Sequence, residues 1–187
     1  MRALPNMTVI EPADNEACRQ AVLAMGDHQG PCYLRVARDV LPAIFDGSHK
    51  FQVGRGVALR RGGDVTLVAS GRMVTEALRA AIELERVGIG AAVIDMSTIK
   101  PLDVDLLVAS ARVTGAVVTA ENASIIGGLG GAVAEALGEN CPVPLVRVGV
   151  RDVYGESGPD DALTAKYGLG APDIVAAART AIRRKRR

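Results

Sequence analysis

Glu121 and a run of glycines form the part of this sequence best suited to binding a small ligand. The segment reads Glu121-Asn-Ala-Ser-Ile-Ile-Gly-Gly-Leu-Gly-Gly131 and lies between a predicted strand and a predicted helix. Ligands of α/β proteins usually dock at such strand ends. The glycines would let the backbone approach a partner closely, and the N-terminus of the helix could hold an anion. We therefore single out Glu121, Gly127, Gly128 and Gly130 as a candidate interface or effector loop.

The same segment does not fit the dinucleotide-binding pattern. Val133 stands where Gly-x-Gly-x-x-Gly places its third glycine, and no acidic residue follows at the expected distance. The plainer interpretation, which we favour, is a tight strand-to-helix turn packed against a neighbouring domain.

The other polar residues do not assemble a catalytic site. His28 and His49 have no nucleophile or metal-ligand spacing nearby, and Ser157 lacks the trailing glycine of a nucleophile elbow. The chain has 3 cysteines at scattered spacings, which suits neither a disulfide framework nor a zinc site. We predict no catalytic residue and no metal site within this chain, and a reducing, cytoplasmic location.

A string near the C-terminus carries a family resemblance. Asp152-x-Tyr-Gly-Glu-Ser-Gly158, followed by Leu163-x-x-Lys-Tyr-Gly-Leu169, closely resembles the C-terminal domain of transketolases. The segment from Met1 to Asp14 is similar to the last third of the pyrimidine-binding domain that precedes it in this family. The resemblance covers nearly the whole chain.

The resemblance implies a role for Arg38. Transketolases move a two-carbon ketol unit between sugar phosphates with thiamine diphosphate and a divalent metal, and an arginine at this strand end holds the sugar phosphate in the substrate channel. A guanidinium suits the task because its fork matches phosphate oxygens bidentately. The alternative is a surface arginine paired with Asp39 or Asp46. Arg35, on the alternate face of the same strand, is the weaker candidate.

Much of the family's cofactor site is missing from this sequence. There is no Gly-Asp-Gly motif followed by paired asparagines, and the chain begins after the point where the family places its activating glutamate. We expect this chain alone to bind no thiamine diphosphate and to be inactive. It would need a companion N-terminal subunit or segment, and the incomplete first unit would expose a sheet edge that favours a homo- or hetero-oligomer.

Two other kinds of function stay open: a different enzyme of the same superfamily, and a non-enzymatic module. Transketolases often carry a histidine where this chain has Ala123, so the Glu-Asn-Ala trio looks closer to 1-deoxyxylulose-5-phosphate synthase; a 2-oxoacid dehydrogenase β-type subunit is a further relative. The Tyr154 and Lys166 strings favour transketolase. A non-enzymatic interaction or regulatory module is the third reading, but such a module has no need of residues 1–38 with their channel-facing arginine.

The elements that would position these residues follow from hydrophobic periodicity and turn residues. Strands are predicted at 8–10, 32–37, 57–59, 65–69, 91–95, 116–119 and 145–149. Asp14 is predicted to cap the helix that follows it, and further helices are predicted at 73–87, 103–111, 131–138, 160–167 and 172–184. The run at 91–95 is hydrophobic on both faces, as buried parallel strands are. Arg61-Gly-Gly63 reads as the turn of a hairpin. The alternation predicts a three-layer α/β fold whose sheet is mostly parallel, with one antiparallel edge strand from the hairpin, preceded by a partial β-α-β unit.

The resemblance divides the chain into three parts. Residues 1–45 would be the C-terminal remnant of a pyrimidine-binding domain, 46–56 a linker, and 57–187 the transketolase C-terminal domain.

Composition excludes some classes of partner. The chain has 187 residues, 49% hydrophobic and 23% charged, with a net charge of +1. Aromatic residues make up 3%, which leaves little for a base-stacking surface, and no apolar run reaches the roughly 20 residues that span a bilayer. We therefore expect neither nucleic acid nor a membrane as a partner.

Overall fold

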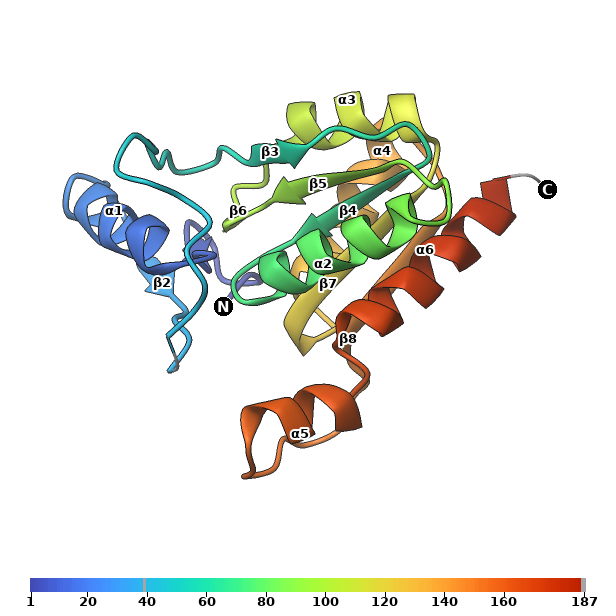
Figure 1. Cartoon of the computed structure of the whole chain (residues 1–187). Helices are drawn as coiled ribbons and strands as arrows, with labels where there is room; N and C mark the ends of the chain where they lie inside the picture. Colours follow the sequence, from blue (N-terminus) through green and yellow to red (C-terminus); the bar gives the residue numbers. More distant parts are fainter. Residues whose placement is uncertain (39, 186–187) are drawn as a thin grey trace.

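Two sheets organise the molecule, as the computed structural model in Figure 1 shows. The structure describes residues 1–38 and 40–185. The strands are β1 (Thr8–Ile10), β2 (Cys32–Leu34), β3 (Val57–Arg60), β4 (Val65–Ala69), β5 (Ala91–Asp95), β6 (Thr98–Lys100), β7 (Val117–Ser124) and β8 (Leu145–Val150). The helices are α1 (Asn15–Gly26), α2 (Met73–Glu85), α3 (Val104–Thr114), α4 (Leu129–Asn140), α5 (Asp160–Lys166) and α6 (Ala171–Lys185).

The first sheet has the order β2-β1-β6 and contains the predicted β-α-β unit. β1 and β2 run parallel, and α1 connects them. Asp14 caps α1 as predicted, because its Oδ1 accepts from the Ala17 N–H at 2.8 Å. Its Oδ2 accepts from the N–H groups of Ile44 and Phe45, both at 2.7 Å, and so fixes the connecting segment. The third strand, β6, pairs antiparallel with β1 and was not predicted.

The second sheet is the middle of three layers. Its order is β3-β5-β4-β7-β8, and all pairs are parallel except β3 with β5. α2 and α6 pack on one face and α3 and α4 on the other, each pair with its own apolar core (Figure 1). β4 and β5 are buried along their whole length, which explains their continuous apolar runs. The predicted α/β class, with one antiparallel edge strand, is confirmed.

The predicted hairpin between β3 and β4 is wrong, because β5 lies between them. The turn that joins β3 to β4 crosses the start of β5. Asp64 and Gly90 exchange two hydrogen bonds of 2.8 Å there, and a Cβ on Gly62 would overlap the backbone of Ala91 and Ala92. The glycines therefore serve this close crossing, and the edge strand pairs with β5.

The predicted division of the chain into three parts stays a prediction. Because β6 comes from the second unit but completes the sheet of the first, the two units share a sheet. Asp39 and the last two residues, 186–187, lie outside the described part of the chain. Among the described helices, none combines the length and the apolar character that crossing a membrane requires.

Candidate functional site

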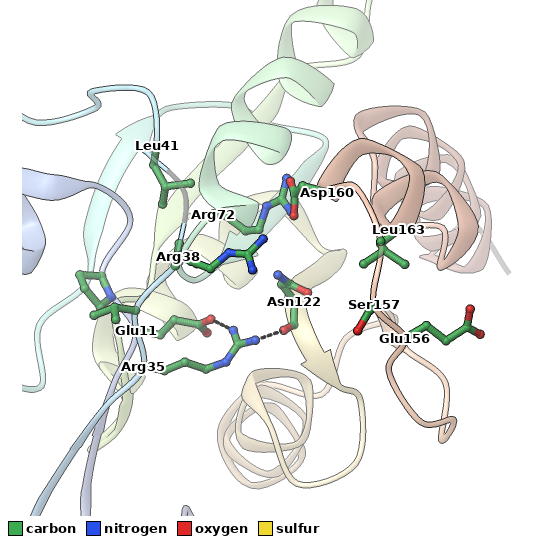
Figure 2. A pocket seen from close by; sticks show the side chains of 15 residues that line it. Glu11, Arg35, Arg38, Leu41, Arg72, Asn122, Glu156, Ser157, Asp160 and Leu163 are labelled. Atoms are coloured by element: carbon green, nitrogen blue, oxygen red, sulfur yellow. Dashed lines mark hydrogen bonds and ion pairs between the residues drawn. The ribbon is translucent and has the colours of Figure 1, made fainter.

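A cleft of about 360 Å³ lies where the carboxyl ends of strands from both sheets meet. Residues that follow β1, β2 and β4 line it together with Asn122 of β7, and the segment before α5 closes one side (Figure 2). Three arginines line this cleft: Arg35, Arg38 and Arg72. The location is the one where open α/β sheets bind ligands, and the arginines suit an anion.

Glu11, the residue after β1, anchors the cleft. Its side chain is buried, accepts a 2.7 Å hydrogen bond from the Ser70 hydroxyl, and forms an ion pair with Arg35. Its backbone carbonyl accepts from the Gly71 N–H at 3.0 Å. Gly71 has φ +54°, and a Cβ there would approach the Glu11 side chain to 2.8 Å. Glycine is therefore required for the turn after β4 to pack against Glu11.

Arg35 joins the two units across the cleft. Besides its ion pair with Glu11, its Nη2 donates to the Asn122 carbonyl at 2.6 Å, and Figure 2 shows both interactions. The strand was predicted to reach residue 37, but β2 ends at Leu34. The alternation that set Arg35 apart from Arg38 therefore does not apply, and both residues line the same cleft.

Arg38 and Arg72 point into the same part of the cleft, as Figure 2 shows. Arg38 comes from the segment after β2, and its proposed binding of a phosphate stays a prediction. Arg72 follows β4 in the Ser70-Gly71-Arg72 turn and pairs with Asp160 at the start of α5. Sequence reasoning missed Arg72, although its place just after a buried parallel strand was a usable signal.

Glu121 serves as the anion at the N-terminus of α4. Its carboxylate accepts from the N–H groups of Leu129 and Gly130, each at 2.8 Å. A Cβ at Gly128 would overlap the Glu121 carboxylate, and one at Gly130 would come within 2.9 Å of it. Gly127 has φ +76° and so needs a left-handed conformation. The close approach of Glu121 thus explains Gly128 and Gly130, and the backbone conformation explains Gly127, while an interface or effector role of the loop stays a prediction.

Two buried carboxyls, Asp95 and Glu121, have raised pKa values. Burial raises the pKa of Asp95 to about 7, against the hydrogen bond from Ser97. Burial also raises the pKa of Glu121 to about 7, against the two backbone N–H groups that favour the ionised form. The charge of Glu11 adds to both shifts.

We expect the free energy of unfolding to fall as the pH rises from about 4 to 7. In this window the folded chain still holds protons on Asp95 and Glu121, whose pKa is about 7, while the unfolded chain has released them. The slope should approach about 1.4 kcal/mol per pH unit for each group. Urea unfolding at several pH values measures it. Asp95→Asn should remove about half of the slope, and an unchanged slope would contradict the assignment.

Two features of the described residues bear on a metal ion and on a diphosphate. Within residues 1–38 and 40–185, no three His, Cys, Asp or Glu side chains are grouped to hold a metal ion. The glycine-rich turn does not fit a diphosphate, because Glu121 already uses the N–H groups of Leu129 and Gly130. A second anion at this turn would be repelled by the Glu121 carboxylate, which already occupies these N–H groups.

Fold and cleft together define an α/β protein with an arginine-lined cleft at the carboxyl ends of its parallel strands. The model of the "Transketolase, C-terminal domain" family matches residues 54–174. The chain belongs to the transketolase family and represents a C-terminal section of it.

Individual relatives of the chain support this family assignment. The chain is 53% identical over 185 residues to a 6-deoxy-6-sulfo-D-fructose transketolase subunit of Clostridium sp. (strain MSTE9), covering 99% of this chain and 58% of that protein. A solved split-gene transketolase, an inactive β4 tetramer, superimposes with a TM-score of 0.96 at 53% identity, over 99% of this chain and 61% of that one. The chain thus spans about three fifths of these relatives' length.

The synthase considered above is a more distant relative. A 1-deoxy-D-xylulose-5-phosphate synthase of Syntrophotalea carbinolica is 39% identical over 182 residues, which cover 96% of this chain and 29% of that protein. The 53% identity to the 6-deoxy-6-sulfo-D-fructose transketolase subunit is higher, which agrees with the preference drawn from the Tyr154 and Lys166 strings.

Proposed function

We propose that this chain is the C-terminal subunit or section of a thiamine-diphosphate-dependent transketolase, which moves a two-carbon ketol unit between sugar phosphates in the cytoplasm. The arginine-lined cleft carries the proposal, because its guanidinium groups at the strand ends suit the phosphate of a sugar. A companion N-terminal subunit or segment would hold thiamine diphosphate and its divalent metal. When bound, the cofactor supplies the carbon nucleophile.

The role of this chain in the reaction is to bind and orient the substrate. Arg38 would hold the phosphate end of the sugar with its planar fork, which keeps its charge at every working pH. Glu11 and Arg35 would keep the cleft wall in place, because their ion pair and the Asn122 contact tie the two units together. Because binding already fixes one end of the sugar, less translational and rotational entropy is lost in reaching the transition state.

The relatives support the proposal of a companion and an oligomer. One is a transketolase subunit, and another is a split-gene transketolase described as an inactive β4 tetramer. By analogy, this chain would associate with copies of itself when alone and gain activity only with its companion.

Reconstitution tests the proposed function. The purified chain should show no ketol transfer and no saturable binding of thiamine diphosphate. Adding the companion, identified by native mass spectrometry of the complex captured from the source cells, should restore both. A pyruvate donor run in parallel tests the synthase reaction. Ketol transfer by the pure chain, or a fully loaded complex that is inactive with every ketose phosphate tried, would contradict the proposal.

A further inference from the structure

Arg72 occupies a position that calls for an anion. It is the N-cap residue of α2 but makes no side-chain cap bond, and its side chain is only 19% exposed. A cation at the positive end of a helix is unfavourable unless an anion lies nearby. The backbone at this turn is fixed, because Ser70 and Gly71 both bond to Glu11. Arg72 is therefore held beside the cleft and must be neutralised there.

Asp160 provides that anion from a lightly held element. Its carboxylate pairs with Arg72, but its side chain is 44% exposed. It begins α5, a helix of 7 residues of which none is buried. The preceding segment, 151–159, is exposed throughout. Elements with so few buried contacts open at low free-energy cost, so Asp160 can leave while Arg72 stays.

We propose that Arg72 is a second anion-binding residue of the cleft, and that Asp160 occupies it until the substrate's phosphate takes its place. The proposal rests on the function proposed above, because the anion is the phosphate end of the sugar. Arg72 would bind one edge of the phosphate and Arg38 another. When the substrate binds, α5 and the segment 151–159 before it would then move away from Arg72.

The charge of the ligand decides whether it can replace Asp160 at Arg72. A phosphate monoester carries about −1.5 to −2 at pH 7 and offers three acceptor oxygens, whereas Asp160 carries one negative charge and is partly solvated. Two guanidinium forks on one phosphate make several charge-assisted hydrogen bonds, which are the strong kind. A phosphate can therefore displace the aspartate, and a neutral sugar cannot.

Calorimetric titration of the full-length chain with inorganic phosphate, at constant ionic strength, tests the proposal. Arg72→Gln should weaken phosphate binding about 10-fold or more, because a charge-assisted pair is lost. Asp160→Asn should tighten binding several-fold, since the internal competitor is gone. Arg79→Gln is the matched control: Arg79 lies on the same helix, pairs with Glu76 and is 62% exposed, so binding should not change.

The outcomes separate this inference from the proposed function. Tighter binding by Asp160→Asn supports it specifically, since loss of structure cannot strengthen binding, and urea midpoints check that every variant is folded. If Arg38→Gln weakens binding while Arg72→Gln and Asp160→Asn do not change it, Arg72 is no part of the site and the Arg38 assignment survives. If Arg38→Gln alone has no effect, the phosphate assignment of Arg38 fails. No saturable binding by the unmodified chain overturns the inference, while ketol transfer by the reconstituted enzyme still tests the function.

Discussion

Arg38→Ala in the reconstituted enzyme should lower kcat/KM for a phosphorylated sugar about 100-fold, with most of the loss in KM. The proposed contact is a charge-assisted, bidentate one. Hydrogen bonds to charged groups contribute about 1.5–3 kcal/mol, and 1.4 kcal/mol is a factor of ten. Because the phosphate is remote from the reacting carbons, the contact stabilises ground and transition states alike, which places the loss in KM. Steady-state kinetics with a ketose phosphate measures it.

The matching phosphate-free sugar provides the control. With that substrate the wild-type enzyme and Arg38→Ala should differ little, since there is no anion to hold. Arg38→Lys should recover part of the activity on the phosphorylated sugar, because it keeps the charge but loses the fork. An equal loss on both sugars would mean that Arg38 supports the fold or the channel, and not the phosphate.

Local signals in the sequence predicted most of the fold. The continuous apolar run of β5 indicated a buried parallel strand, and β5 is buried along its length and parallel to β4. Asp14 at the start of α1 was predicted as a cap and is one. These features depend on neighbours within a few residues, so the chain's local pattern contains the information.

Features that depend on distant partners could not be predicted in this way. β6 is three residues long and is defined by pairing with β1, about 90 residues earlier. Arg72 meets Asp160 across 88 positions. The Gly-Gly turn after β3 looked like a hairpin because the crossing of β5 leaves the same glycine signature. Arg35 was set apart on a strand length that the structure shortens, since β2 ends at Leu34.

Glu121→Ala should lower the free energy of unfolding by about 2–4 kcal/mol. The change leaves the buried N–H groups of Leu129 and Gly130 without acceptors, at about 1–3 kcal/mol each, and removes the anion that complements the α4 dipole. Part of this cost is offset, because a buried carboxylate whose pKa is raised to about 7 is itself unfavourable when ionised. Urea unfolding at pH 7.5 measures the difference.

Two further variants show what the effect depends on. Glu121→Gln keeps one acceptor oxygen of the same size, so it should lose less than the alanine variant does. Glu139→Ala, near the other end of α4 and exposed, should change stability by less than about 0.5 kcal/mol. If Glu121→Ala were as stable as the unmodified chain, the glycines of this turn would not serve to seat Glu121. The turn would then have to be explained by a partner that approaches it, which is the interface or effector role predicted from the sequence.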